Sequence, residues 1–212
     1  MDNTEYFDAV AGQWDNMRSR LFTDEVRESA LRIADVQAGR TATDIGAGTG
    51  FLTEGLLRRG LNVIAVDHSS EMLGQVQRKF AESGRLQARQ GESEQLPIGD
   101  GAVDHVFANM YLHHVESPGG AIREMVRILK PSGTIVVTDL DEHTHEFLRV
   151  EHHDRWLGFK HDDIRRWFLE AGLHDIAVLG IAQECRVKSD SGCETAAISI
   201  FAASGRKWGG EP

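Results

Sequence analysis

The sequence predicts an α/β fold in which helices cover both faces of a mostly parallel, doubly wound sheet. Strand-like and helix-like runs alternate through most of the chain, which is typical of that architecture. A glycine-rich turn joins the first strand-like run to a helix-like run. The last two strand-like runs are separated by a short polar turn, so we expect them to pair antiparallel. No linker, repeat or low-complexity segment interrupts the pattern, and a single domain is expected over residues 1–212.

Two helix-like runs precede the first strand. Apolar residues recur at helical spacing from Tyr6 to Met17 and from Thr23 to Val36. The second run begins with Thr23-Asp24-Glu25, a good N-cap followed by acidic first-turn residues. We expect residues 1–38 to form a helical cap that serves as a lid.

Strands and helices alternate from there up to residue 139. Runs with strand-like composition predict strands, and apolar residues at helical spacing predict helices between them. Intervening helices allow neighbouring strands to run parallel. We expect strands at 41–43, 62–67, 85–89, 103–109 and 134–139, and helices near 50–60, 70–83 and 118–130.

The last third of the chain has a different organisation. Residues 140–172 are expected to form a helical insert on the substrate side of the sheet. Residues 173–205 should hold two antiparallel strands, Ile176 to Val187 and Thr195 to Ser204, joined by the turn Ser189-Asp190-Ser191-Gly192.

The two cysteines, Cys185 and Cys193, flank that turn symmetrically. They are too few for a disulfide framework, so reduced thiols are expected. If the hairpin is in register about Ser189, the two cysteines would face each other and could form a bridge under oxidation.

The turn after the first strand, Asp44 to Gly50, indicates a nucleotide-like cofactor site. Its glycines let a ligand approach the main chain, and the start of the next helix offers unpaired N–H groups. The dinucleotide fingerprint needs its third glycine where this chain has Phe51, which disfavours an NAD-dependent oxidoreductase. Asp67 ends the next strand about twenty residues on, where a ribose diol would need a bidentate acceptor.

The motif D-x-G-x-G-x-G, formed by Asp44 to Gly50, resembles motif I of the class I S-adenosylmethionine (SAM) methyltransferases. Two blocks, Gly91 to Pro97 and Gly99 to Val115, resemble the adenine-binding loop and fourth strand of that family. They are most similar to its ubiquinone/menaquinone C-methyltransferase-like branch, the methyltransferase type 11 domain, and the resemblance continues from Met125 to Asp139. It implies a Rossmann-like class I methyltransferase fold with a SAM-binding core at 41–139. The implied seven-stranded sheet has the order 3-2-1-4-5-7-6 with the last strand antiparallel.

The resemblance implies a SAM-dependent methyltransferase whose product is S-adenosylhomocysteine (SAH). Asp67 would bind the ribose, while Glu92 and Ser93 would bind the adenine, with Glu92 standing where the family more often has Asp. Because a strand-end carboxylate should be exposed, Asp67→Ala is expected to abolish cofactor binding and leave the fold intact. The expected cofactor-binding residues are Tyr6, Trp14, Asp44, Gly46, Ala47, Gly48, Asp67, His68, Met72, Glu92, Ser93, Asn109, Met110 and His114.

The N-terminal segment resembles the start of the lid in the same family. Tyr6, Phe7 or Trp14 could cover the sulfonium, with a cation–π attraction of roughly 0.5 to 2 kcal/mol. The alternative is that these aromatic residues form the core face of a helix. Arg18 could meet the carboxylate of the methionine part of the cofactor, although a solvent position is favoured.

Methyl transfer from a sulfonium needs alignment of the acceptor more than a protein nucleophile, and a base is needed only if the acceptor must lose a proton. The expected catalytic residues, just beyond the fourth strand, are Tyr111, His113 and His114; packed histidines are the alternative. The expected substrate residues are Tyr6, Tyr111, Asp139, His143 and His145.

Histidines are unusually frequent after the fifth strand. The segments Asp139 to Glu146 and Glu151 to Phe159 resemble part of methyltransferase modules that are fused to arsenic-repressor-type regulators. Arsenite methylation is not expected, because such enzymes need three or more thiolates.

A metal site is also not expected. His145 and His152, with Glu151 or Asp141 nearby, could share a helix face and offer imidazole and carboxylate ligands. However, their spacing matches no standard motif.

The charge balance argues against a nucleic-acid partner. The chain has 23 Lys and Arg against 33 Asp and Glu, a net charge of −10, and no basic cluster offsets it. No window approaches the roughly twenty apolar residues of a membrane span, and the N-terminus has no signal-peptide character. We expect a cytoplasmic enzyme acting on a small molecule, without a nucleic-acid or membrane partner; oligomeric state is not indicated. A SAM- or SAH-binding regulatory protein without catalysis is the alternative.

Overall fold

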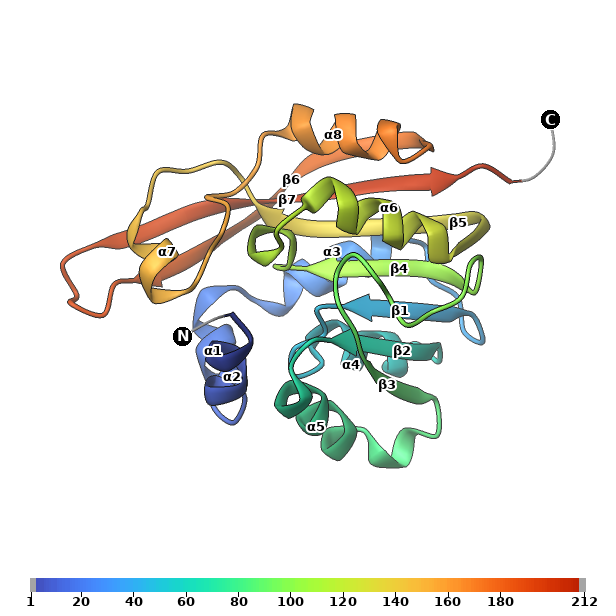
Figure 1. The fold of residues 1–212 in the computed structure, drawn as a ribbon, viewed down its shortest axis with the longest axis horizontal. Helices are drawn as coiled ribbons and strands as arrows, with labels where there is room; N and C mark the ends of the chain where they lie inside the picture. Colours follow the sequence, from blue (N-terminus) through green and yellow to red (C-terminus); the bar gives the residue numbers. More distant parts are fainter. Residues whose placement is uncertain (1–2, 210–212) are drawn as a thin grey trace.

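A single seven-stranded sheet organises the molecule. The computed structural model describes residues 3–209. Its strands are β1 (Thr41–Ile45), β2 (Asn62–Asp67), β3 (Leu86–Gln90), β4 (Val103–Asn109), β5 (Leu129–Leu140), β6 (Leu173–Lys188) and β7 (Thr195–Lys207). They lie in the order β3-β2-β1-β4-β5-β7-β6, and β7 pairs antiparallel with both β5 and β6 (Figure 1). The predicted fold class and strand order are confirmed.

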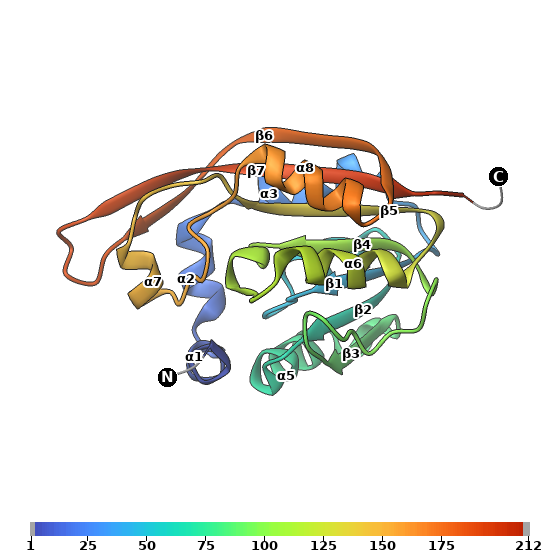
Figure 2. The same ribbon diagram turned by 45° about the horizontal axis from the view of Figure 1, so that its top comes forward.

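Helices cover both faces of this sheet (Figures 1 and 2). The α-helices are α1 (Asn3–Val10), α2 (Trp14–Leu21), α3 (Asp24–Ile33), α4 (Phe51–Arg58), α5 (Ser70–Lys79), α6 (Pro118–Ile128), α7 (Phe147–Glu151) and α8 (His161–Glu170). Two short 3₁₀ helices are η1 (Ala81–Ser83) and η2 (Leu112–His114). Among residues 3–209, no helix has the length and apolar character needed to cross a membrane.

The core consists of two main layers, one on each face of the sheet. Ile122 of α6 and Phe168 of α8 pack with Val106 of β4 in one layer. Leu56 of α4 packs with Phe107 of β4 in the other layer. Successive β4 side chains point to opposite faces, so Val106 and Phe107 serve different layers. This burial on both faces accounts for the consecutive apolar residues from Val106 to Ala108.

The N-terminal cap differs from the expected single helix between Tyr6 and Met17. The helix stops at Val10, and the Gln13 N–H donates to the Val10 carbonyl at 2.8 Å, closing a turn that contains Gly12. Glycine lowers helix stability by about 1 kcal/mol relative to alanine, which favours a break there. The predicted helix 70–83 is also shorter, because Phe80 leaves the helical conformation.

The insert at 140–172 is also more divided than expected. Ile164 and Phe168 of α8 are fully buried against the sheet, so α8 belongs to a core layer. In contrast, α7 lies beside the carboxyl ends of the parallel strands, near α1 and α2 (Figures 1 and 2). Only the first half of the insert therefore faces the substrate side.

The C-terminal hairpin does not bring the two cysteines together. Cys185 is paired with Ile198 in the β6–β7 register, whereas Cys193 lies in the exposed turn. The register about Ser189 that would make them face each other does not occur, because the strands end at Lys188 and Thr195, before Cys193. Both thiols are free.

Candidate active site

A cavity of about 400 Å³ opens over the carboxyl ends of the parallel strands. Doubly wound sheets bind ligands at this edge, where the loops after the strands diverge. The volume lies within the usual range of small-molecule pockets. Among the predicted site residues, those that line it are Tyr6, Trp14, Gly46, Ala47, Gly48, Asp67, His68, Met72, Glu92, Ser93, Asn109, Met110, Tyr111, His113 and His114.

The glycine-rich loop begins at the floor of this cavity. The N–H groups of Gly46 and Ala47 donate to the Val66 carbonyl at 2.9 and 3.0 Å, which turns the chain sharply after β1. Gly46 has a φ of +67°, and a side chain there would overlap the Tyr111 ring. Glycine at this position therefore serves both the turn and the close approach of Tyr111.

Asp44 supports the loop from beneath. Its Oδ2 accepts from Thr53 N at 2.9 Å and from Thr53 Oγ1 at 2.7 Å, so the carboxylate ties the end of β1 to the first turn of α4. The side chain is buried outside the cavity lining. Burial raises the pKa of Asp44 to about 7, against the opposing hydrogen bonds from Thr53.

Asp67 stands at the end of β2 and faces the loop. Its two oxygens accept from Gly48 N at 2.8 Å and from Ser69 N at 2.9 Å. The residue is only 7% exposed, so the expectation of an exposed strand-end carboxylate is wrong. Each oxygen keeps a second lone pair for a ligand hydroxyl.

The side of the cavity beyond β3 carries Glu92, Ser93 and Tyr111. Burial raises the pKa of Tyr111, so its hydroxyl remains a hydrogen-bond donor at neutral pH.

Aromatic rings of the N-terminal cap close the cavity from above. Phe7 makes edge contacts with Trp14, His68 and His114, at ring-centroid distances of 5.5, 5.9 and 5.1 Å. Tyr6 lies against His153, with centroids 4.7 Å apart. The short helices α1 and α2 therefore join the loops after β2 and β4 into one wall.

Arg18 also lines this wall, contrary to the favoured solvent position. Its guanidinium carbon lies 4.3 Å from the centre of the Phe51 ring. Among the described residues, Arg18 Nε and His68 Nε2 are buried polar atoms without a hydrogen-bond partner. A polar ligand in the cavity would form hydrogen bonds with these two atoms and so offset the cost of burying them.

A buried Asp–His pair forms the opposite end of the cavity. Asp139, at the end of β5, accepts from His113 Nδ1 at 2.6 Å and from the backbone N–H groups of Leu112 and Leu140, each at 2.8 Å. Although burial disfavours the imidazolium, the carboxylates of Asp139 and Asp154 raise the pKa of His113 to about 9.

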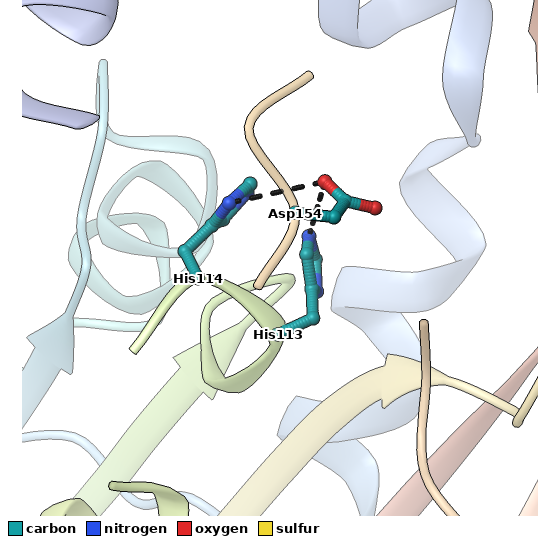
Figure 3. Close-up of side chains that lie close together, drawn as sticks. All are labelled: His113, His114 and Asp154. Atoms are coloured by element: carbon teal, nitrogen blue, oxygen red, sulfur yellow. Dashed lines mark ion pairs between the residues drawn. The ribbon is translucent and has the colours of Figure 1, made fainter. Parts of the chain in front are cut away.

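Asp154 lies on the far side of His113 (Figure 3). Its Oδ1 is 3.9 Å from His113 Nε2 and 3.9 Å from His114 Nδ1. Burial raises the pKa of Asp154 to about 6, and burial lowers the pKa of His114 well below its ordinary value. Asp154 and the two imidazoles thus line this end of the cavity, with Asp139 buried behind them.

The comparisons with known proteins fit this geometry. Residues 43–137 match the family model described as "Methyltransferase domain". A demethylmenaquinone methyltransferase of Thermobifida fusca is 30% identical over 181 residues, which are 83% of this chain and 71% of the relative. The chain belongs to the methyltransferase domain family. The predicted family and its SAM cofactor are thereby confirmed.

Other methyltransferase relatives match a shorter part of the chain. An uncharacterized methyltransferase of Mycobacterium tuberculosis is 40% identical over 98 residues, which are 46% of this chain and 39% of the relative. The chain therefore spans less than half the length of that protein. The resemblance to modules fused to arsenic-repressor-type regulators stays a prediction.

Solved structures show the same fold at low sequence identity. One comes from a complex between the Haloferax volcanii Trm112 methyltransferase activator and a putative methyltransferase. It has a TM-score of 0.80 and 23% identity, with 99% of both chains covered. Another is Haemonchus contortus phosphoethanolamine N-methyltransferase 2 with phosphomonomethylethanolamine and SAH. Its TM-score is 0.72 at 15% identity, covering 86% of this chain and 52% of that one.

Four predicted site residues of this methyltransferase-family chain lie outside the cavity lining. Asp44 and Asp139 are buried behind it and position Thr53 and His113. His143 and His145 stack on each other, with centroids 5.5 Å apart, beyond the residues that line the cavity.

Several lining residues were absent from the predicted set. Phe7 and Arg18 had been considered as a lid residue and as a partner of the cofactor carboxylate, but neither was among the expected site residues. Asp154 and Cys185 also line the cavity. No local motif surrounds either residue, and only long-range packing brings them to the site.

Proposed function

We propose that this chain transfers the methyl group of SAM to a small-molecule acceptor. The supporting observation is that one cavity extends from the glycine loop and Asp67 to the polar end at His113 and Asp154. A ligand in such a cavity can touch the family motif at one end and the acceptor groups at the other. The cytoplasmic location expected from the sequence is part of this proposal.

The cofactor end has the groups that SAM requires. Asp67 would accept from the ribose hydroxyls, Glu92 and Ser93 would contact the adenine, and the loop from Gly46 to Gly48 would lie under the methionyl part. Arg18 would pair with the carboxylate of that part, because its buried Nε lacks a partner in the described residues. When bound, SAM supplies a sulfonium methyl group that needs no protein nucleophile.

At the acceptor end, Tyr111, His113 and His114 would orient the substrate, and Phe7 with Trp14 would exclude water from the transfer. The names of relatives support a small organic acceptor. They include a ubiquinone biosynthesis O-methyltransferase of Methylococcus capsulatus, 31% identical over 150 residues. The fold neighbour from Haemonchus contortus is in complex with phosphomonomethylethanolamine, a small molecule. A contact of His143, His145 or Asp139 with substrate stays a proposal that needs movement of the insert.

Replacement of Asp67 tests this proposal. Asp67→Asn removes the charge and one acceptor, so the dissociation constant for SAH in calorimetry should rise at least about tenfold. Asparagine is preferred to alanine because alanine would leave the Gly48 and Ser69 N–H groups without their acceptor.

Asp104→Asn is the matched control. Asp104 also accepts from a backbone N–H, that of Thr41 at 2.9 Å, but it lies near the amino end of β4, at the opposite edge of the sheet. Its replacement should leave SAH affinity unchanged. Equal SAH affinity of the wild type and Asp67→Asn would refute the cofactor site.

A further inference from the structure

Three potential metal ligands converge at the acceptor end of the cavity. His113, His114 and Asp154 each offer one ligand atom, and these atoms all lie within 4.8 Å of one another. Figure 3 shows both imidazoles turned towards the same carboxylate. Exposure of the side chains is 7%, 14% and 4%, so the group is shielded from bulk water.

The Asp154 carboxylate is largely buried beside the two imidazoles. Its Oδ1 lies 3.9 Å from His113 Nε2 and 3.9 Å from His114 Nδ1, too far for hydrogen bonds. These 3.9 Å separations suit an ion placed between the nitrogen and oxygen atoms.

The position of Asp154 is held by the backbone. His113 O accepts from Arg155 N at 2.9 Å and from Trp156 N at 3.0 Å, so the loop after α7 is tied directly to η2. Trp156 Nε1 also donates to Val115 O at 2.9 Å. The carboxylate is therefore placed against the imidazoles by a preorganised contact between segments.

Asp139 orients the ring of His113. The 2.6 Å hydrogen bond engages Nδ1, which leaves Nε2 on the side of Asp154. A carboxylate that holds one nitrogen of an imidazole while the other binds metal is the usual second layer of a metal centre.

We propose that His113, His114 and Asp154 bind one divalent transition-metal ion of the zinc type. Imidazole and carboxylate ligands in this combination suit Zn²⁺ and its neighbours better than Mg²⁺ or Ca²⁺. The sequence analysis expected no metal site. It considered His145 and His152 as ligands, and it did not consider His113, His114 and Asp154 together. His113 and His114 are adjacent in sequence, but Asp154 reaches them through the tertiary fold.

The distances allow such an ion after the ligands close in by up to about an ångström. Tetrahedral Zn²⁺ with bonds of about 2.1 Å places its ligand atoms roughly 3.4 Å apart. The two His–Asp separations are 3.9 Å, and all three ligand atoms lie within 4.8 Å of one another, so the separations need to shrink by roughly 0.5 to 1.4 Å. The weak contact of His114 Nδ1 with His153 O, at 3.5 Å, would be replaced by coordination.

The ion would bind the substrate of the proposed methyl transfer, and this role rests on the proposed methyltransferase function. Three protein ligands leave a coordination position for a substrate, as in catalytic zinc sites. Because all three residues line the cavity, that position faces it. The favoured acceptor class carries a hydroxyl, thiol or carboxylate that binds the ion and thereby aligns the molecule with the methyl donor.

The test measures metal binding without turnover. The full chain, purified without a histidine tag and stripped with chelator, is titrated with Zn²⁺ in calorimetry and with Co²⁺ by visible absorption. We expect one ion per chain and Co²⁺ bands of a site with fewer than six ligands. A wild-type chain that binds no stoichiometric Zn²⁺ would overturn the proposal.

Two variants locate the site, and one variant controls for nonspecific binding. Asp154→Asn and His114→Gln should each weaken Zn²⁺ binding at least about tenfold. Asp141→Asn removes a carboxylate from another Asp–His pair, 2.7 Å from His161 Nε2, and should leave Zn²⁺ affinity unchanged. Unaltered affinity in both site variants would contradict the assignment.

SAH titration of the same samples separates the two proposals. Zn²⁺ binding without SAH binding would refute the proposed function and leave the metal site standing. SAH binding without Zn²⁺ binding would do the reverse. Circular dichroism checks folding, and His114→Gln, at the most exposed of the three positions, carries the test if Asp154→Asn does not fold.

Discussion

At the scale of single residues, the carboxylates at the strand ends divide into supporting and contacting groups. Asp44 and Asp139 lie behind the cavity and orient Thr53 and His113. Asp67 and Asp154 line the cavity themselves. The same residue type at the same sheet edge thus has two tasks, and burial together with hydrogen-bond partners distinguishes them.

Asp44 should make stability depend on pH. Burial raises its pKa in the folded state to about 7 from 3.8, so the folded chain binds a proton that the unfolded chain releases. Relative to Asp44→Asn, wild-type stability should fall between about pH 4 and pH 7 and stay constant above. The loss should be on the order of 1 to 4 kcal/mol. Asparagine keeps an oxygen acceptor for Thr53.

Urea unfolding of both proteins across this pH range measures the difference. Because all other titrating groups are shared, subtraction isolates the contribution of Asp44. A difference that is independent of pH would show that Asp44 ionises in the folded chain as it does in the unfolded chain.

At the scale of elements, polar contacts hold the cap helices over the cavity. Asp8 of α1 accepts from Ser69 Oγ, next to the end of β2. Asp15 of α2 accepts from Thr49 Oγ1 at 2.6 Å and forms an ion pair with Lys79 of α5. These contacts join the lid to the glycine loop and to α5, the helix that follows β2.

Removal of these contacts should loosen the lid. We expect Asp8→Ala combined with Asp15→Ala to speed hydrogen exchange over residues 3–21 and to weaken SAH binding about three- to tenfold. Partly exposed pairs contribute about 1 kcal/mol or less each, which sets this modest size. Hydrogen exchange by mass spectrometry and calorimetry measure the two effects.

The matched control removes two acids elsewhere. Asp162→Ala with Asp163→Ala makes the same change of charge in the first turn of α8. This helix takes no part in the contacts between the lid, the glycine loop and α5 described above. It should leave exchange of the lid and SAH affinity unchanged. Equal lid protection in both double variants would mean that apolar packing of Phe7 and Trp14 alone holds the cap.

At the scale of the whole molecule, the cavity joins three parts of the chain. The cap, the sheet core and the insert all contribute to the cavity wall. A ligand bound there should therefore stabilise the fold cooperatively. At SAH concentrations one hundred times the dissociation constant, linkage predicts about 2.7 kcal/mol, or roughly 5 to 10 °C in melting temperature.

Differential scanning calorimetry checks this shift. NAD⁺ at the same concentration should produce none, because Phe51 stands where a dinucleotide site requires glycine. A larger shift with NAD⁺ than with SAH would point to an oxidoreductase.

The sequence by itself determined the alternation of strands and helices and the glycine-rich turn at one end of the cavity, whereas the strand order followed from the family resemblance. Residues from Asp44 to Gly50 are contiguous, and the turn between β1 and α4 depends on glycine conformations and a nearby helix start. Asp67 follows from the position of the next strand end. Local chain stiffness and hydrophobic periodicity encode such features, so they are readable without the fold.

Only the tertiary structure decided the end of the cavity at His113. Asp154 reaches His113 and His114 across 41 and 40 residues of chain, through backbone contacts between the insert and η2. Arg18 faces the cavity because α1 and α2 separate at a turn that helical spacing did not indicate. Convergence of this kind depends on long-range packing, in which every contact requires others to be in place. For that reason the same histidines could be seen in the sequence but not assigned to a common site.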